Sequence, residues 1–383
     1  MALGYEPQRL HPHTYLPRWH DGVSGLTCSP STETSTDGPV VTSEGVTFLF
    51  DDWAEDAESI SLVQEVAWPR TGPTFSRVGP RWEVGFERPP VDRFEYRFEV
   101  VRGSGEHALV LDPANPRRAP GAFGERSVIE FPEYRAPSWV AAEASDGEVL
   151  EVALTAPRLG REQPALLWSP AGASAGEPLP LLVALDGMEF ARYSGLTHML
   201  DVCVADSSLP RMRALLLQPT ERDAHYTASP DFAWSLAHEV IPAAEQLVAV
   251  TPGPNGRVGL GASLGGLALL HAHRLEPGAF GALFIQSSSL MHHGYMPGFV
   301  YFDRIEKFVN EVLASGFWRS PIRITMTCGV VEQNLANNRD VVAALCEQGY
   351  RAELHVTRDA HNWIGWRDAW TPHLCDLLRE TWG

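Results

Sequence analysis

The feature that most constrains the fold is a change in hydrophobic periodicity partway along the 383-residue chain. Between about 39 and 135, apolar residues occupy every second position of several short runs. In the run 93–100, for instance, aromatic and aliphatic side chains alternate strictly with Arg and Glu. Such alternation is typical of half-buried antiparallel strands, and turn-rich stretches separate the runs. We therefore predict a small β-sandwich over 39–135.

From residue 136 onward the pattern differs. Runs such as 179–185 and 213–217 are almost continuously apolar, and stretches with helical periodicity lie between them. Continuous runs are typical of parallel strands that helices cover on both faces. The expected organisation is thus a polar, Pro- and Ser-rich arm over 1–38, the β-sandwich over 39–135, and an α/β domain with a doubly covered, mostly parallel sheet over 136–383.

Charge and composition exclude several classes of partner. The formal net charge is -18, whereas nucleic acids and anionic membranes are bound by clustered Lys and Arg. The five cysteines are scattered, without a CxxC pair or a His at finger spacing, so we expect no structural zinc and no other metal or cofactor. We see no signal peptide and no apolar run of about 18 residues, which predicts a cytoplasmic protein without membrane contact. The sequence leaves the oligomeric state open.

The strongest local motif is Gly261–Gly265, which has the pattern G-x-S-x-G around Ser263. Strand-like residues precede it, and the helical stretch 267–272 follows. A serine on a tight strand–turn–helix bend is raised above a sheet and lies at a helix N-terminus, where partial positive charge favours a developing anion. We therefore interpret Ser263 as a candidate nucleophile.

A serine hydroxyl needs a base, and chains with this elbow place the histidine last in the sequence. His361 follows the probable strand 352–357 and precedes the final helices, so it is our candidate base. Four other histidines are rivals by proximity to the serine. His271 and His273 belong to the helix after Ser263 and should point away from it, whereas His292 and His293 could line a pocket.

The acid that orients the histidine should follow the penultimate strand, for which 322–328 is the candidate. Glu332 comes four residues after this strand and is our preferred acid. Its role would be to fix the imidazole tautomer and stabilise the imidazolium. Asp340 and Asp359 are the alternatives.

An oxyanion hole needs two backbone N–H donors. Leu264, the residue after the nucleophile, is expected to supply one. The other should come from the turn after an early strand. Gly187 and Met188 follow the apolar run 179–185, so we name both as candidates for the second donor.

Four segments together resemble a known family. They are LLVALDGMEF, GASLGGLALL, PIRITMTCGVVEQNLANNRDVVAAL and AHNWIGWRDAW. They are similar to the putative esterases, a family that includes esterase D-like enzymes. The two-domain layout, with an early-set immunoglobulin-like domain first, resembles the enterochelin esterases, which hydrolyse catecholate siderophore trilactones. The resemblance covers roughly residues 40 to 383.

The resemblance implies an α/β-hydrolase fold and a serine carboxylic ester hydrolase with a Ser-His-Glu triad and an acyl-enzyme. The expected partner is a small-molecule siderophore ester, enterobactin-like and either iron-free or ferric; iron is then substrate rather than cofactor. Candidate substrate contacts are Arg192, Arg222, Trp363 and Ser287. Two features depart from the family pattern: His292 and His293 replace an expected aromatic wall, and Asp359 with Ala360 replaces the usual glycine pair before the histidine.

Two other functions stay open on the sequence. A serine esterase for another acyl substrate, such as an acylated sugar or a thioester, would use the same triad. A catalytically silent binding protein of the same fold would need none of Ser263, Glu332 and His361, so the presence of all three weighs against it.

Overall fold

The structure is a computed structural model that describes residues 38–52, 55–66, 71–79, 81–143, 146–292 and 299–383. The predicted N-terminal arm therefore lies outside the described residues, except for Gly38. The other two segments are described almost throughout. The boundary that we place at residue 135 stays a prediction.

The described elements up to β10 are strands, and from β13 onward strands alternate with α-helices, as the two sequence patterns predict. The strands are β1 (Val40–Val41), β2 (Gly45–Asp51), β3 (Ala57–Gln64), β4 (Thr71–Thr74), β5 (Ser76–Val78), β6 (Arg81–Glu87), β7 (Arg93–Arg102), β8 (His107–Val110), β9 (Arg118–Ala119), β10 (Arg126–Glu130), β11 (Glu148–Leu154), β12 (Gln163–Ser169), β13 (Leu181–Leu185), β14 (Arg213–Leu217), β15 (Arg257–Ala262), β16 (Ala282–Gln286), β17 (Arg323–Gly329) and β18 (Arg351–Thr357). The α-helices are α1 (Gly187–Ser194), α2 (Leu196–Ala205), α3 (Arg222–Tyr226), α4 (Pro230–Ser235), α5 (Ile241–Glu245), α6 (Leu264–Leu275), α7 (Phe302–Ala314), α8 (Leu335–Glu347), α9 (Trp363–Asp368) and α10 (Cys375–Trp382).

The first region is a β-sandwich, as the alternating pattern predicts. One sheet has the order β1-β2-β6-β5 and the other β4-β3-β7-β10-β9, with β8 added to β7. Alternate side chains of β7 enter an aromatic core, where Tyr96 meets Phe48 edge-on at 4.7 Å between ring centroids. Burying such rings is a large hydrophobic contribution for a small domain.

Arg93 and Glu95 are not part of the aromatic core, in keeping with the alternation of β7. Their side chains are nevertheless only 3% and 8% exposed, so this face of the strand is not open to solvent. The reason is that the loop 358–362, which follows β18, covers the other face of the first residues of β7. Both faces of this end of β7 are therefore buried.

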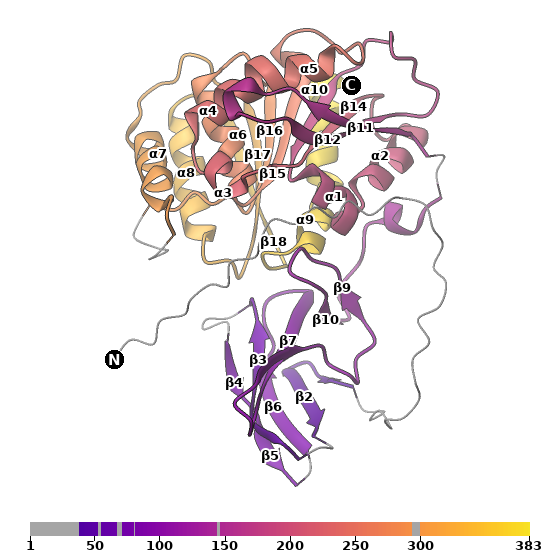
Figure 1. Ribbon diagram of the computed structural model, residues 1–383, viewed down its shortest axis with the longest axis vertical. Helices are drawn as coiled ribbons and strands as arrows, with labels where there is room; N and C mark the ends of the chain where they lie inside the picture. Colours follow the sequence, from indigo (N-terminus) through magenta and orange to yellow (C-terminus); the bar gives the residue numbers. More distant parts are fainter. Residues whose placement is uncertain (1–37, 53–54, 67–70, 80, 144–145, 293–298) are drawn as a thin grey trace. The chain divides into compact units, whose positions relative to one another are not determined.

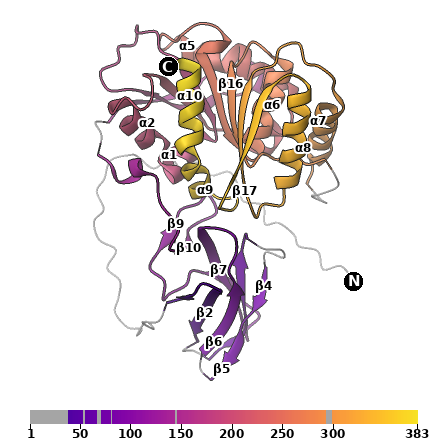
Figure 2. The ribbon, with the colours of Figure 1, turned by 180° about the vertical axis from the view of Figure 1, so that it is seen from behind.

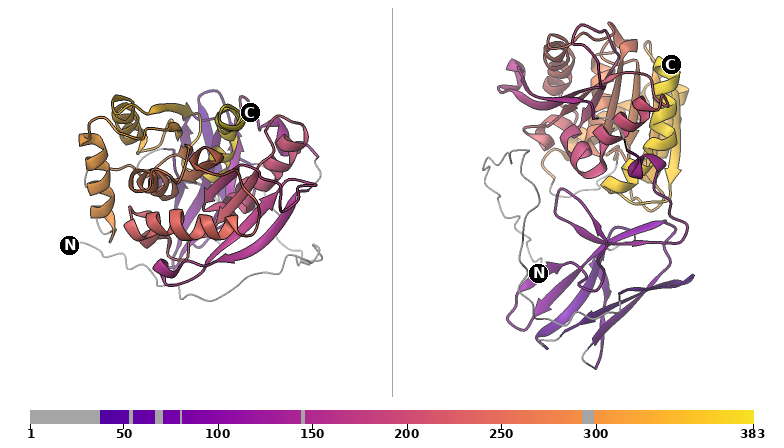
Figure 3. Two further views of the ribbon diagram at one scale, coloured as in Figure 1. Left: turned by 90° about the horizontal axis from the view of Figure 1, so that it is seen from above. Right: turned by 90° about the vertical axis from the view of Figure 1, so that its right-hand side faces the viewer.

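The second region contains an eight-stranded sheet of order β11-β12-β14-β13-β15-β16-β17-β18. All neighbours from β14 to β18 pair in parallel, whereas β11 and β12 are antiparallel. Apolar side chains from each central strand pack on both faces. Helices α3 to α8 cover one face and helices α1, α2, α9 and α10 the other (Figures 1, 2 and 3). The predicted doubly covered, mostly parallel sheet is confirmed.

Helix α4 begins directly after Ser229, whose hydroxyl accepts a hydrogen bond from the Phe232 amide at 3.3 Å. Pro242 does not end it. Instead, the turn Leu236–Val240 widens to a π-helix before α5 begins. A π turn shifts the hydrogen-bond ladder and so accommodates the missing proline donor.

Candidate active site

Ser263 lies between the end of β15 and the start of α6, with φ 55° and ψ -121°. A non-glycine residue rarely adopts this left-handed backbone conformation, and such strain is concentrated at functional sites. A Cβ at Gly261 would lie 2.7 Å from the backbone carbon of Gly265. The turn therefore needs glycine at 261, as the elbow motif predicts.

The second close approach falls on the glycine after the motif. A Cβ at Gly266 would lie 2.1 Å from Ser288 Oγ, whereas one at Gly265 would make an ordinary contact of 3.5 Å with Asp186 Oδ2. Position 266 thus lets α6 pack against the segment after β16. The motif's own second glycine has room for a methyl group.

His361 and Glu332 meet directly. His361 Nδ1 lies 2.6 Å from Glu332 Oε2. The carboxylate side chain is 3% exposed and the imidazole 31%, so the pair is sheltered while one edge of the ring stays accessible. A carboxylate on Nδ1 places the proton there and leaves Nε2 as the free acceptor, which is the tautomer that a general base requires.

The other carboxylate oxygen of Glu332 is held as firmly. Oε1 accepts hydrogen bonds from Ser287 Oγ at 2.6 Å and from the Gly329 amide at 2.7 Å. The Ser287 hydroxyl in turn accepts from Trp366 Nε1 at 2.9 Å, and Trp366 meets the His361 ring edge-on. Ser287, which we predicted to contact substrate, is therefore buried behind the acid.

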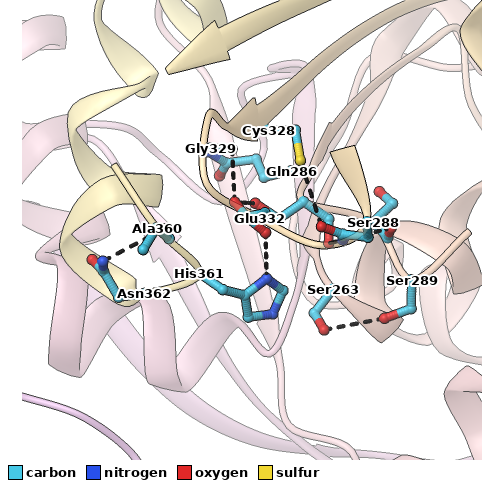
Figure 4. Close-up of polar contacts among 12 residues, drawn as sticks. Ser263, Gln286, Ser288, Ser289, Cys328, Gly329, Glu332, Ala360, His361 and Asn362 are labelled. Atoms are coloured by element: carbon cyan, nitrogen blue, oxygen red, sulfur yellow. Dashed lines mark hydrogen bonds and ion pairs between the residues drawn. The ribbon is translucent and has the colours of Figure 1, made fainter. Parts of the chain in front are cut away.

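The serine and the histidine face one cavity of about 360 Å³. Figure 4 shows the free nitrogen of His361 turned to the side where Ser263 lies. The hydroxyls of Ser263 and Ser289 are 3.2 Å apart. The described residues that line this cavity are Glu65, Arg222, Asp223, Ser263, Leu264, Ser289, Met291, Phe299, Ile305, Val331, Glu332, Gln333, Asn334 and His361.

Sequence reasoning missed three residues that build this site. Ser289 contacts the candidate nucleophile, and its amide donates to the Ser263 carbonyl at 3.0 Å. Asn334 and Asn338 donate to the Ser288 carbonyl at 3.1 and 2.9 Å. Together they hold the turn after β16, where Ser287 has φ 47°. Asn334 directly precedes α8, but its side chain makes no capping hydrogen bond and holds the turn after β16 instead.

The candidate oxyanion donors start two helices. The Leu264 amide belongs to the first turn of α6, where N–H groups have no partner within the helix, and Leu264 lines the cavity. Gly187 and Met188 open α1 directly after β13, the parallel neighbour of β15. A Cβ at Gly187 would lie 2.3 Å from Leu216 Cα. Position 187 needs glycine for packing, and the second donor stays a prediction.

The rival histidines lie elsewhere. His271 and His273 are buried in α6, and burial lowers the pKa of each imidazole to about 4. His292 Nε2 contacts Asp340 Oδ2 at 3.2 Å. His293 falls outside the described residues.

The predicted substrate contacts separate into two groups. Arg222 lines the cavity and binds Asp186 with Nε and Nη2, the latter at 2.7 Å from Oδ2. Arg192 is exposed on α1 and lies over the Tyr193 ring. Trp363 packs among aromatic side chains, with its ring 5.3 Å from that of Phe190. The structure thus brings Arg222 to the cavity and places Arg192 and Trp363 outside its described lining.

Neither a metal centre nor a membrane segment is found in the described part of the chain. It holds no group of three or more His, Cys, Asp or Glu side chains arranged to bind a metal ion. None of its helices is long and apolar enough to cross a membrane. A larger hollow of about 870 Å³ beside α2 is lined by residues such as Trp168 and Arg379, but by none of the candidate catalytic residues.

Sequence comparison assigns a family to the second region. A model of the family described as "Putative esterase" matches residues 156–376. The iron(III) enterobactin esterase of Dickeya dadantii (strain 3937) is 29% identical over 196 residues, which are 49% of this chain and 45% of that protein. The match thus spans less than half of that relative's length.

Structure comparison covers almost the whole chain. Enterochelin esterase from Shigella flexneri superposes with a TM-score of 0.73 over 90% of this chain and 96% of that one, at 19% identity. Ferric enterobactin esterase from Salmonella typhimurium gives 0.73 over 91% and 98%, at 20% identity. At such identities the likeness establishes the fold. The predicted α/β-hydrolase fold with an N-terminal β-sandwich is therefore confirmed.

Proposed function

Because this chain belongs to the putative esterase family, we propose that it is a serine carboxylic ester hydrolase acting on an enterobactin-like catecholate trilactone. Ser263 is the nucleophile, His361 the general base and Glu332 the acid. Hydrolysis opens the trilactone scaffold, and with a ferric substrate this weakens the hold on iron. The three relatives described above are enterobactin or enterochelin esterases, which supports the substrate class.

One observation supports the proposal most. A carboxylate bound to imidazole Nδ1 at 2.6 Å shares a cavity with a serine in a strained elbow conformation. The serine, the carboxylate and the imidazole are the three groups that a Ser-His-Glu triad needs. They come together although Ser263 and Glu332 are 69 residues apart in sequence, and Glu332 and His361 are 29 apart. A binding protein would gain nothing from this arrangement.

Acylation follows from the geometry. As Ser263 Oγ attacks the ester carbonyl carbon, His361 Nε2 takes the hydroxyl proton, and Glu332 stabilises the imidazolium. The Ser263–His361 contact need not be formed before substrate binds, because such catalytic hydrogen bonds often tighten in the complex. The substrate carbonyl oxygen becomes an oxyanion, which the amide of Leu264 and that of Gly187 or Met188 would stabilise.

The intermediate then collapses. The bond from the carbonyl carbon to the leaving alkoxide breaks, and His361 returns its proton to that oxygen. A water molecule next attacks the Ser263 acyl-enzyme with His361 again as base, which releases the carboxylic acid and restores the serine. Atoms and charge balance with water as the sole co-reactant.

The charged side chains of the cavity should favour either the iron-free or the ferric form of the substrate. The described lining of the cavity contains two charged groups that salt bridges neutralise, the guanidinium of Arg222 by Asp186 and the carboxylate of Glu65 by Arg126. The carboxylates of Asp223 and Glu332 also line it, so negative charge remains in excess. A ferric catecholate complex is anionic and would meet like charge here. We therefore expect faster hydrolysis of the iron-free trilactone than of the ferric form.

The test compares hydrolysis of iron-free and ferric enterobactin by wild type, Ser263→Ala and Ser289→Ala, with products separated by chromatography. Ser263→Ala should lower kcat by about 10⁶-fold, as removal of such a nucleophile does. Ser289→Ala removes the hydroxyl 3.2 Å away and should keep kcat within about tenfold of wild type.

Labelling by a fluorophosphonate probe gives a second readout that is independent of the substrate. Wild type and Ser289→Ala should be labelled, and Ser263→Ala should not. If Ser263→Ala hydrolyses as fast as wild type, Ser263 is not the nucleophile. If wild type is labelled but leaves both forms of the trilactone intact, the esterase chemistry stands and the substrate class is wrong.

A further inference from the structure

The loop that carries His361 is docked on the β-sandwich. The Asp92 amide donates to the Arg358 carbonyl at 2.8 Å, and Arg358 Nε donates to Asp92 Oδ1 at 2.9 Å. Ala360 is 6% exposed and packs in the sandwich's own hydrophobic cluster. Residues on both sides of His361 in the sequence are therefore in contact with a different domain from the one that carries Ser263.

Arg93 is the charged centre of this contact. Its side chain is 3% exposed, and Nη1 lies 3.1 Å from Glu95 Oε1, 3.6 Å from Asp359 Oδ2 and 3.5 Å from Asn362 Oδ1. Burial alone would lower the pKa of this guanidinium, but Glu95 and Asp359 more than offset it and the pKa is raised. A buried cation of this kind persists because it is paired.

The two loop residues that Arg93 contacts flank the histidine and shape its backbone. Asp359 Oδ1 accepts from the Ala360 amide and from Asn362 Nδ2, both at 2.7 Å. Asn362 Oδ1 accepts from the Gly365 amide at 2.7 Å and so caps α9. The conformation on either side of His361 thus depends on two side chains that share one guanidinium.

The acid is supported by the same domain. Val330 and Val331, directly before Glu332, pack against the sandwich cluster. The acid loop and the histidine loop also meet tightly, since a Cβ at Gly329 would lie 2.2 Å from the Asp359 carbonyl oxygen. Both members of the acid–histidine pair therefore rest on the β-sandwich.

We infer that Arg93 is a positioning residue for catalysis: through Asp359 and Asn362 it fixes the backbone that aims the His361 imidazole at Ser263. The β-sandwich is then part of the catalytic apparatus rather than an appended domain. The inference rests on the proposed function, because aiming matters only if His361 acts as the base. It also gives a role to Asp359, which stands where the family resemblance led us to expect glycine.

The contrasting interpretation is that Arg93 merely holds two domains together. In that case its loss lowers stability, while the folded fraction turns over substrate as wild type does. A misaimed base instead lowers the rate of the chemical step at constant substrate affinity, and displacement of about 1 Å can reduce that rate about 100-fold.

The first test uses Arg93→Met and Arg93→Lys, with Arg117→Met as the matched control. Arg117 lies in the same domain, and its salt bridge to Glu130 is solvent-exposed. All three polar contacts of Arg93 are made by one atom, Nη1, so a lysine ammonium can occupy that place. We expect Arg93→Met to lower kcat by about 10- to 100-fold with KM unchanged, Arg93→Lys to recover most of the loss, and Arg117→Met to have no effect.

Two further readouts report on the histidine itself. The rate of fluorophosphonate labelling of Ser263 should fall in Arg93→Met in parallel with kcat. The far-downfield proton resonance expected for the Nδ1–H shared with Glu332 should broaden or shift in Arg93→Met and stay unchanged in Arg117→Met. Each measurement is made on full-length protein whose folded fraction is checked by circular dichroism.

A second variant decides the matter if Arg93→Met does not fold. Asp359→Asn keeps an oxygen to accept the Ala360 amide but removes the charge that faces Arg93, and a neutral buried group is less costly. We expect it to lower kcat about tenfold without changing KM. Wild-type kcat and labelling in folded Arg93→Lys, Arg93→Met and Asp359→Asn alike would overturn the inference. Failure of the proposed function would look different, because wild type itself would then be inactive or unlabelled.

Discussion

Ser287 Oγ donates a hydrogen bond to Glu332 Oε1 at 2.6 Å, on the carboxylate oxygen opposite the one that His361 contacts. The same hydroxyl accepts from Trp366 Nε1 at 2.9 Å. Ser287 therefore links the Glu332 carboxylate to the aromatic ring that packs against the His361 imidazole. Its position makes it a support for Glu332 rather than a substrate contact.

Replacement of Ser287 by alanine should weaken catalysis and folding together. A hydrogen bond to a charged group contributes about 1.5–3 kcal/mol. If that energy is lost from the transition state, kcat should fall about tenfold or more while KM stays unchanged. Leaving Trp366 Nε1 buried without a partner should lower the free energy of unfolding by about 1–3 kcal/mol. Steady-state kinetics and urea denaturation measure the two effects. Ser288→Ala is the control, since the described structure gives that hydroxyl no partner; equal losses in both variants would contradict the assignment.

Glu332→Gln should lower kcat by about 10⁴-fold while the protein stays folded. The amide cannot stabilise the imidazolium, and its NH₂ group can turn to Nδ1 and favour the wrong tautomer. Kinetics with any ester that wild type hydrolyses will measure this loss. Asp340→Asn is the matched control for the rival acid, because the Asp340 side chain is 57% exposed on α8 and contacts His292. If kcat fell further in Asp340→Asn than in Glu332→Gln, Asp340 rather than Glu332 would be the acid of the triad.

The elbow glycines should differ sharply in tolerance. Gly261→Ala places a methyl group 2.7 Å from the Gly265 backbone and should abolish activity or soluble expression. Gly265→Ala meets its first neighbour at 3.5 Å, so the melting temperature should change little despite the position's place in the motif. Thermal denaturation of both variants measures the difference. Equal destabilisation would show that the contacts at the elbow are not those described.

The sequence predicted the parallel sheet and the elbow turn because each leaves a local pattern. Continuous apolar runs give buried parallel strands, and the G-x-S-x-G turn is encoded by adjacent residues. Glu332 and His361 are instead chosen by their order after the strands, and their catalytic roles stay a prediction. The residues that hold the candidate catalytic groups in place leave no such local pattern in the sequence. Arg93 lies in a run that alternates perfectly, and only the three-dimensional approach of the loop 358–362 explains why its charged side is buried. Likewise Asn334 satisfies every local expectation of a helix cap, yet its amide binds the carbonyls of Ser287 and Ser288.

Two buried histidines in α6 should each contribute a loss of stability in mild acid. Burial lowers the pKa of His271 and His273 to about 4, from an ordinary value near 6.5. The unfolded chain therefore binds more protons than the folded one below pH 6.5, so each histidine destabilises the fold progressively as pH falls from about 6.5 to about 4. The full effect is about 3 kcal/mol for each, at 1.36 kcal/mol for each pKa unit.

Other buried groups titrate in the same range with the opposite sign, so the histidine contribution has to be isolated by difference. Burial raises the pKa of Glu95 to about 7, which makes the folded state hold its proton more tightly than the unfolded chain. Urea denaturation of wild type and His273→Gln at pH 7, 6, 5 and 4.5 cancels that common contribution. The difference in unfolding free energy between the two proteins should move in favour of His273→Gln as pH falls. A pH-independent difference for His273→Gln would mean that His273 is not buried in its neutral form.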